Sequence, residues 1–446
     1  MVWFFYQEKN KRRAKYPLLL KSKKGLYHFP NNLLMRYIYT LFFLLSMTIN
    51  SQAQHPTCDG TRYLNEVFPS VDTTFNVFFG VNTTYQGNVD SLYMDVYQPV
   101  GDTASKRPLL ILAFGGSFIV GERTDMAPLC HYYAQHGYVT ATIDYRLFDG
   151  LFVPFPDSVV FADVVIKAIG DMKASIRHFR EDAATINLYK IDTNVVFIGG
   201  GSAGAIMALH VAYMDSTDNI PTHIQTALDN NGGFEGNTTT NTQYNSKVQG
   251  VLNLSGALGD ASWVDAGDVP VFSVHDDNDA IVPYGQGYST VAGFPVSYLE
   301  GSQVIADTAT ALGIPNVLIT IPNSTGHVSY VNDPLWQDSV FTGILVFLNE
   351  IICPMPSSTK RFLYSRDVVV YPNPAVRNIT IELSDLESTY ALVLYNNMGQ
   401  QVFLQEGIRE SQFTLSRQNL PAGVYYLKLV FEGERRASVQ SKIIFN

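Results

Sequence analysis

A serine flanked by glycines, between a strand-like run and a helix-like run, is the feature that most constrains this chain. Residues 198–205 read Ile-Gly-Gly-Gly-Ser-Ala-Gly-Ala, after the β-branched run 194–197 and before an apolar, helix-like run. A strand-to-helix turn this tight strains the serine backbone, and it accepts only small residues two positions away, such as Gly200 and Gly204. The pattern predicts that Ser202 is an exposed nucleophile at the end of a buried strand.

Two other interpretations of the turn remain open, a ligand-binding loop and a purely structural turn. A dinucleotide fingerprint places Gly-x-Gly-x-x-Gly near the first strand, with an acidic residue about 20 positions later. A phosphate-binding Walker loop ends in Gly-Lys-Ser/Thr. Here the motif lies in mid-chain and Ser202 is followed by Ala203-Gly204. Other features of the chain are therefore needed to choose between a nucleophile, a ligand-binding loop and a structural turn.

Alternating strand-like and helix-like segments from about residue 109 to 347 predict an α/β fold with a doubly wound, mostly parallel sheet. The strand candidates are 92–97, 109–113, 138–143, 194–198, 248–254, 269–275 and 316–321. The helix candidates are 128–136, 159–181, 203–214, 302–312 and 336–350. Reactive groups are expected at the carboxyl ends of the strands. Residues 215–247, rich in Asn, Thr and Gly, form either a pocket wall over the sheet or a disordered loop.

A nucleophilic serine needs a base and an acid that orients the base. Of the nine histidines, His327 lies in a loop after a late strand, where its ring can reach over the serine. The acid is expected between serine and histidine in chain order. Asp279 precedes an apolar Ile-Val-Pro that would anchor its loop, whereas Asp276 and Asp277 are expected to be solvated turn residues.

A calcium-binding turn is the alternative for the acidic stretch 276–279, but the distal glutamate of a full calcium loop is missing. We therefore predict no metal site and no organic cofactor. The oxyanion hole needs backbone N–H groups, one from the residue after the nucleophile and others from a Gly-rich loop after an early strand. Phe114-Gly-Gly-Ser follows the strand 109–113, so the expected donors are Gly116, Ser117 and Ala203.

Residues 92–350 resemble the α/β-hydrolase superfamily, in its branch of type-B and hormone-sensitive-lipase-like carboxylesterases. The similar motifs are the elbow at 200–204, the oxyanion loop at 114–117, Asp-Tyr-Arg-Leu at 144–147, Asp279 and Gly326-His327. The chain departs from the family pattern at three positions. Gly201 replaces a common Asp or Glu, Ala205 replaces a glycine, and Phe114 replaces the histidine of the oxyanion loop. None of these departures removes a catalytic group, but they blur the subfamily and the substrate.

After a Pro/Ser-rich linker at 354–366, the pattern changes to seven short strands with turns between them, which predicts a small β-sandwich at 367–446. Its Tyr-Pro-Asn-Pro start and Gly-Val-Tyr-Tyr strand resemble the C-terminal sorting domain of the type IX secretion system of Bacteroidetes. The resemblance implies that the outer-membrane secretion machinery is a partner. A sandwich that binds carbohydrate or another protein is the alternative.

Residues 1–53 have the pattern of a leader with a signal peptide: a basic start, a short apolar run and a Ser-x-Ala cleavage site, with Met35 as the expected true start. A membrane anchor is the alternative, but the apolar run is short for a stable span. This segment holds nine Lys or Arg and one acid. The remaining 21 bases and 39 acids give a formal charge of −18, which argues against nucleic acid as a partner.

The three cysteines fit an exported chain, in which disulfides persist. Cys58 and Cys353 lie at the two ends of the expected catalytic domain, 54–353, and a bridge between them would tie these ends together. Cys130 lies in an amphipathic stretch and is expected to be a buried apolar residue.

Taken together, these features predict a secreted or surface-attached serine carboxylesterase that acts on small-molecule or glycan-linked esters. A prolyl-oligopeptidase-type serine peptidase shares the triad, although no propeller domain precedes the catalytic region. A non-catalytic binding protein on a hydrolase scaffold is the alternative of a different class.

Overall fold

The structure is a computed structural model that describes residues 55, 57–153, 155–354, 368–383, 389–396, 400–417, 420–431 and 438–445. The expected leader at 1–53 and, apart from residue 354, the expected linker lie outside the described residues. No helix among the described residues combines the length and apolarity needed to cross a membrane.

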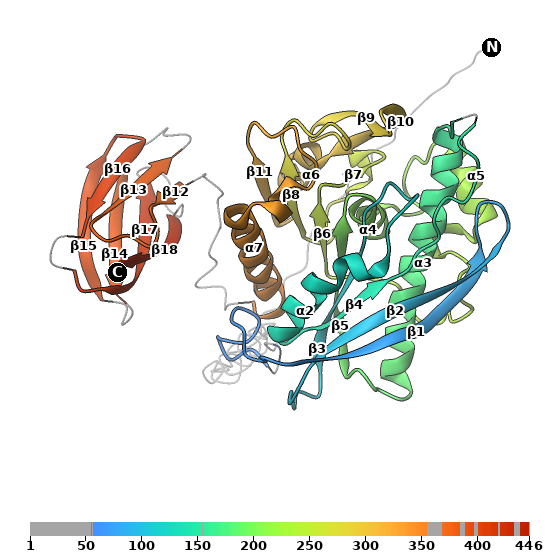
Figure 1. Cartoon of the computed structure of the whole chain (residues 1–446), viewed down its shortest axis with the longest axis horizontal. Helices are drawn as coiled ribbons and strands as arrows, with labels where there is room; N and C mark the ends of the chain where they lie inside the picture. The colour runs from blue at the N-terminus through green and yellow to red at the C-terminus, as the bar shows by residue number, and fades with distance from the viewer. Residues whose placement is uncertain are drawn as a thin grey trace, which may run out of the picture. The chain divides into compact units, whose positions relative to one another are not determined.

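An eight-stranded sheet with the order β1-β2-β4-β3-β5-β6-β8-β11 forms the centre of the first part (Figure 1). Its strands are β1 (Val71–Thr83), β2 (Val89–Pro99), β3 (Arg107–Ala113), β4 (Val139–Ile143), β5 (Ile191–Gly201), β6 (Gly250–Leu254), β8 (Val271–Asp276) and β11 (Asn316–Ile321). The β1–β2 and β2–β4 pairs are antiparallel and the other pairs are parallel. The mostly parallel sheet predicted from the sequence is confirmed.

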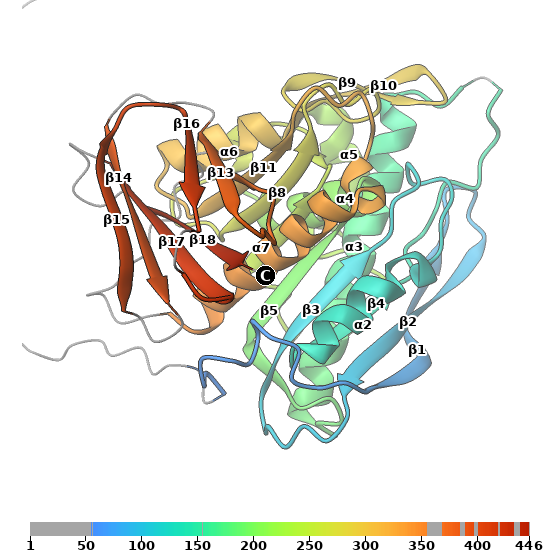
Figure 2. The ribbon, with the colours of Figure 1, turned by 60° about the vertical axis from the view of Figure 1, so that its left-hand side comes forward.

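Helices cover both faces of this sheet, as the turned view in Figure 2 makes clear: α2 and α7 lie on one face, and α3, α4 and α6 on the other. The helices are α2 (Ala127–Gln135), α3 (Ser158–Ala184), α4 (Ala203–Tyr213), α5 (Thr222–Asn230), α6 (Ser302–Ala311) and α7 (Pro334–Ile352). The central strands β3 and β6 are buried at every residue, because helices cover them on both sides.

The register of the parallel strands brings the expected functional loops together. Ala113, the last residue of β3, pairs with Gly200 of β5, so the loop after β3 lies beside the glycine-flanked serine. In the same way Asp276, the last residue of β8, pairs with Ile321 of β11. The loops that hold the expected acid and the expected histidine therefore start side by side, at the carboxyl edge of the sheet.

Three parts of this fold were not expected from the sequence. The edge strand β1 was missed, and so was a small sheet in which β7 (Ala257–Leu258) and β9 (Gln286–Val291) flank β10 (Phe294–Gly301). The stretch 215–247 contains α5, and the loop after it is held on α3. There Asp171 binds Arg146 and Thr238, which are all buried.

The C-terminal part consists of two antiparallel sheets with the orders β12-β13-β16 and β15-β14-β17-β18. Its strands are β12 (Val368–Tyr371), β13 (Asn378–Leu383), β14 (Tyr390–Asn396), β15 (Gln401–Ile408), β16 (Gln412–Ser416), β17 (Gly423–Phe431) and β18 (Ser438–Phe445). Buried side chains alternate along β13, and Ile379 and Ile381 share one core with Leu392 and Leu394 of β14. The predicted small all-β sandwich is confirmed.

Candidate active site

Ser202 occupies the sharp turn between β5 and α4, with φ 52° and ψ −114°. A residue other than glycine is strained at this positive φ. The turn is close-packed, because a Cβ at Gly200 or Gly204 would collide with the carbonyl oxygen of Ala113. At Gly201, by contrast, a Cβ would meet open space. An acidic residue, common at this position in the similar family, would therefore fit here as well.

A chain of two hydrogen bonds joins Ser202, His327 and Asp279. The Oγ of Ser202 lies 2.7 Å from Nε2 of His327, and Nδ1 of His327 lies 2.6 Å from Oδ2 of Asp279. The side chain of Asp279 is fully buried and that of His327 is 20% exposed. The structure thus brings together the three residues that the sequence pointed to separately.

Hydrogen bonds keep Asp279 ionised although it is buried. Burial by itself raises the pKa of this carboxyl group, but bonds from His275 and His327, the positive charge that His327 acquires and the N–H of Ile281 lower it. The net result is a pKa well below its ordinary range. Oδ1 accepts from the N–H groups of Ile281 and Val282, which belong to the apolar anchor that the sequence indicated.

Two further carboxylates hold the loop that carries His327. Asp277 accepts hydrogen bonds from the N–H groups of Asn323 and Ser324, at 2.8 and 3.0 Å. Asp276 accepts from the N–H and the hydroxyl of Ser329. The expectation that Asp276 and Asp277 are solvated was wrong: Asp276 is fully buried, and Asp277 is half-buried against the histidine loop.

Of the three expected oxyanion donors, Ser117 and Ala203 line the same cavity as Ser202, and Gly116 precedes Ser117 in the chain. Gly116 has φ +109°, and a Cβ there would collide with the carbonyl oxygen of Val120. Within the described residues, no backbone carbonyl accepts a hydrogen bond from the N–H of Ser117 or Ala203. These two N–H groups could therefore bind an oxyanion at the cavity.

Tyr145 supports the oxyanion loop, a role that the sequence did not reveal. Its hydroxyl donates to the carbonyl oxygen of Phe114 at 2.9 Å, and the two rings stack with centroids 4.3 Å apart. Phe114, which takes the place of the family's histidine, is thus a buried packing residue. The Asp-Tyr-Arg-Leu motif was the available signal, and its arginine, Arg146, forms the buried ion pair with Asp171.

The cavity that contains Ser202 has a volume of about 350 Å³. Its walls come from α3, α4, α5 and the β9–β10 hairpin, and they are mainly apolar. Residues from these and neighbouring segments include Phe118, Phe161, Ile206, Trp263 and Leu299. The pocket wall that the sequence offered for 215–247 is present in part, through the start of α5.

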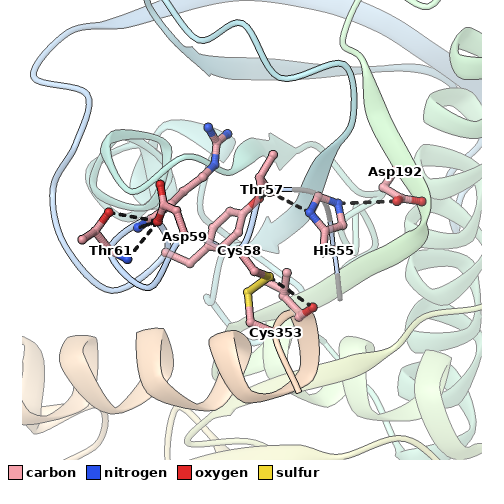
Figure 3. Close-up of a disulfide and its surroundings, with 10 residues drawn as sticks. His55, Thr57, Cys58, Asp59, Thr61, Asp192 and Cys353 are labelled. Carbon is pink, nitrogen blue, oxygen red and sulfur yellow. Dashed lines mark hydrogen bonds and ion pairs between the residues drawn. A yellow bond between two sulfur atoms is a disulfide. The ribbon is translucent and has the colours of Figure 1, made fainter. Parts of the chain in front are cut away.

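The expected bridge between Cys58 and Cys353 is present, whereas Cys130 is a free, buried thiol (Figure 3). The two bridged Cα atoms lie 5.7 Å apart although the residues are 295 positions apart in the chain. Nearby, His55 faces Asp192 at 3.5 Å, as Figure 3 shows. This contact with His55 is the main reason why the pKa of Asp192 is lowered to about 2.

Known proteins resemble both parts of the chain. Residues 94–261 match the family BD-FAE, and residues 369–446 match the secretion system C-terminal sorting domain. No curated protein matches the chain.

Among solved structures, similar ones include two of esterase 2 from Thermogutta terrifontis, a Planctomycetes species. The native form is 17% identical, covers 60% of this chain and 91% of that chain, and has a TM-score of 0.43. The form phosphorylated by paraoxon is 18% identical, covers 65% of this chain and 97% of that chain, and has a TM-score of 0.44. A truncated carbohydrate esterase from gut microbiota is 17% identical, covers 63% of this chain and 96% of that chain, and has a TM-score of 0.44. The two family matches assign residues 94–261 to a BD-FAE esterase domain, within the α/β-hydrolase-like sheet, and residues 369–446 to a secretion system C-terminal sorting domain.

Proposed function

We propose that the protein is an exported serine carboxylesterase that works through an acyl-enzyme. The observation that carries this proposal is the hydrogen-bonded chain of Ser202, His327 and Asp279, at a strained turn beside an apolar cavity. A nucleophile, a base and an acid in this arrangement, with free N–H groups nearby, supply the roles that acyl transfer requires.

In the proposed reaction, Ser202 attacks the ester carbonyl while its proton moves to Nε2 of His327. Nδ1–H of His327 donates to Asp279, which holds the tautomer and stabilises the imidazolium. The N–H groups of Gly116, Ser117 and Ala203 would stabilise the tetrahedral oxyanion. His327 then protonates the leaving alcohol, and an activated water releases the acid.

The cavity favours a neutral ester with an apolar group of moderate size. Its walls are mainly apolar, and the body of the protein outside the leader is acidic, so an anionic substrate would be repelled. His210 lines the cavity without adding charge, because burial lowers its pKa to about 4. Small-molecule and glycan-linked esters both fit this description.

The sorting domain indicates export to the cell surface or the medium. We propose that a signal peptide within residues 1–53 directs the chain across the inner membrane. The C-terminal sandwich would then be recognised by the type IX machinery at the outer membrane. Cell fractionation of the full chain and of a chain ending at residue 353 tests this, with loss of export expected for the shorter chain.

The catalytic proposal is tested with Ser202→Ala, measured against p-nitrophenyl butyrate and a fluorophosphonate probe. We expect loss of turnover and of labelling, whereas Ser175→Ala, at a buried serine within α3, should keep both. Full activity in Ser202→Ala would refute the assignment. A wild-type protein that the probe does not label would support the non-catalytic alternative. Faster cleavage of a proline-containing dipeptide amide than of the ester would support the peptidase.

A further inference from the structure

His275 is a second, fully buried histidine at Asp279, in addition to His327. It lies in β8, and its side chain has no solvent exposure. Its Nε2 is 3.3 Å from Oδ2 of Asp279, the same oxygen that His327 contacts, and 3.1 Å from the carbonyl oxygen of Val282. The only expectation from the sequence was that this residue ends a strand.

Hydrogen bonds on both sides of the ring agree on the tautomer of His275. The N–H of Gly256 donates to Oδ1 of Asn253 at 2.8 Å, so the amide group of Asn253 faces Ser302 with its NH₂. This NH₂ donates to Oγ of Ser302 at 2.9 Å, which leaves the hydroxyl proton of Ser302 free to donate elsewhere. Nε2 of His275 faces two oxygen acceptors, so the neutral ring carries its proton there, and Nδ1, 2.7 Å from Oγ of Ser302, accepts the hydroxyl proton.

The Nε2–H of the neutral ring donates to the carbonyl oxygen of Val282 at 3.1 Å and lies 3.3 Å from Oδ2 of Asp279, close enough to stabilise that carboxylate. Asn253 and Ser302 are also fully buried, so water does not compete for these bonds. Tyr284 is the other titratable group in contact with the ring, edge-on with centroids 5.8 Å apart. Its hydroxyl is already bonded to Thr320 at 2.7 Å.

We propose that His275 is a positioning residue of the active site, which fixes Oδ2 of Asp279 for His327 through a buried chain from Asn253 and Ser302. This inference rests on the proposed esterase function and adds a residue that touches neither substrate nor serine. Asp279 is thereby held on every side: backbone N–H groups hold Oδ1, and the two histidines hold Oδ2.

The proposal predicts a signed change in the pH profile. Without the donor from His275, the carboxylate of Asp279 is more basic and attracts the protonated His327 more strongly. The acid limb of kcat/KM in His275→Leu should therefore move to higher pH, by about 0.5 pH unit. Because Oδ2 is less restrained, kcat should also fall by about 10- to 100-fold. His275→Gln has an amide N–H that can occupy the place of Nε2–H. It should therefore restore most of the wild-type acid limb and most of the wild-type kcat.

The experiment compares these variants with His136→Leu, which removes a buried histidine whose ring bonds the carbonyl oxygen of Tyr132, away from the candidate site. Ser302→Ala provides a second route if His275→Leu does not fold, and it should change the profile in the same direction but less. In an Asp279→Asn background, His275→Leu should cause no further loss of kcat. Profiles of His275→Leu and Ser302→Ala that match that of His136→Leu would overturn the positioning role. If Ser202→Ala still abolishes turnover, the proposed esterase function survives that result.

Discussion

At the scale of single residues, Gly201 and Gly204 on the two sides of Ser202 differ in the space around them. A Cβ at Gly204 would collide with the backbone of Ala113 and Phe114, whereas a Cβ at Gly201 would meet no atom within 4 Å. We expect Gly204→Ala to lose most activity and to lower Tm by several degrees, since backbone atoms must shift. Gly201→Asp should keep wild-type Tm within about 2 °C. Thermal melts and ester assays of the two variants check this, and equal effects would contradict it.

The buried charge of Asp279 predicts how stability depends on pH. Its pKa in the folded state lies well below the value of about 3.9 for an unfolded aspartate. A depressed pKa contributes stability that is fully present above the unfolded value and is lost as pH falls toward the folded value. The stabilisation that this charge gives wild type over Asp279→Asn should therefore shrink as pH falls below about 4. Urea unfolding at several pH values measures it, and a difference unchanged down to pH 3 would contradict the assignment.

At the scale of elements, two loops act as one unit, because the loop after β8 holds the loop after β11. Asp277 uses both carboxylate oxygens to accept backbone N–H groups at 323 and 324. Asp277→Asn places an NH₂ against one of these donors, so the histidine loop should loosen. We expect kcat to fall about tenfold with little change in Tm. Asp215→Asn, in an exposed turn around Thr217, is the matched control and should leave kcat unchanged. Equal kcat values in the two variants would exclude the bracing role.

The sequence predicted elements wherever a local pattern determined them. The short, buried run Leu109–Ala113, bounded by turn residues, was recognised as a strand, and all seven C-terminal strands were recognised as short runs separated by turn residues. The edge strand β1 was missed because it exposes Phe75 and Phe78, so its pattern has no clear apolar face. The helix α5 is short and polar, and its position depends on tertiary contacts rather than on helix propensity.

In the candidate site, too, residues marked by a local pattern were predicted and residues defined by tertiary contacts were not. Ser202 was proposed because its glycines are local, and His327 and Asp279 were proposed from chain order and loop position. His275 was passed over because its partner Ser302, and Asn253 which bonds Ser302, lie 27 and 22 positions away and on other elements. The cavity walls combine residues from seven segments between 117 and 299, so no short window of sequence contains them. A polar group at the end of a buried strand is the one signal that could have directed attention to His275.

At the scale of the whole molecule, the Cys58–Cys353 bridge connects the start of the hydrolase part to the end of α7. It closes a loop of 295 residues, and a cross-link over so long a loop removes much conformational entropy from the unfolded chain. The double variant Cys58→Ser/Cys353→Ser should lose about 2–5 kcal/mol of unfolding free energy. Neither cysteine lines the cavity, so kcat and KM at 25 °C should stay at wild-type values.

Reduction separates the bridge from the effect of the substitutions themselves. Dithiothreitol should lower the Tm of wild type and of Cys130→Ala by similar amounts, because Cys130 is a free thiol and takes no part in the bridge. The double serine variant, which has no bridge to lose, should melt at the same temperature with and without the reductant. If wild type does not respond to dithiothreitol under conditions that reduce the bridge, the bridge does not stabilise the fold. In that case the segments that carry Cys58 and Cys353 are held together by packing around Tyr63 and α7 instead.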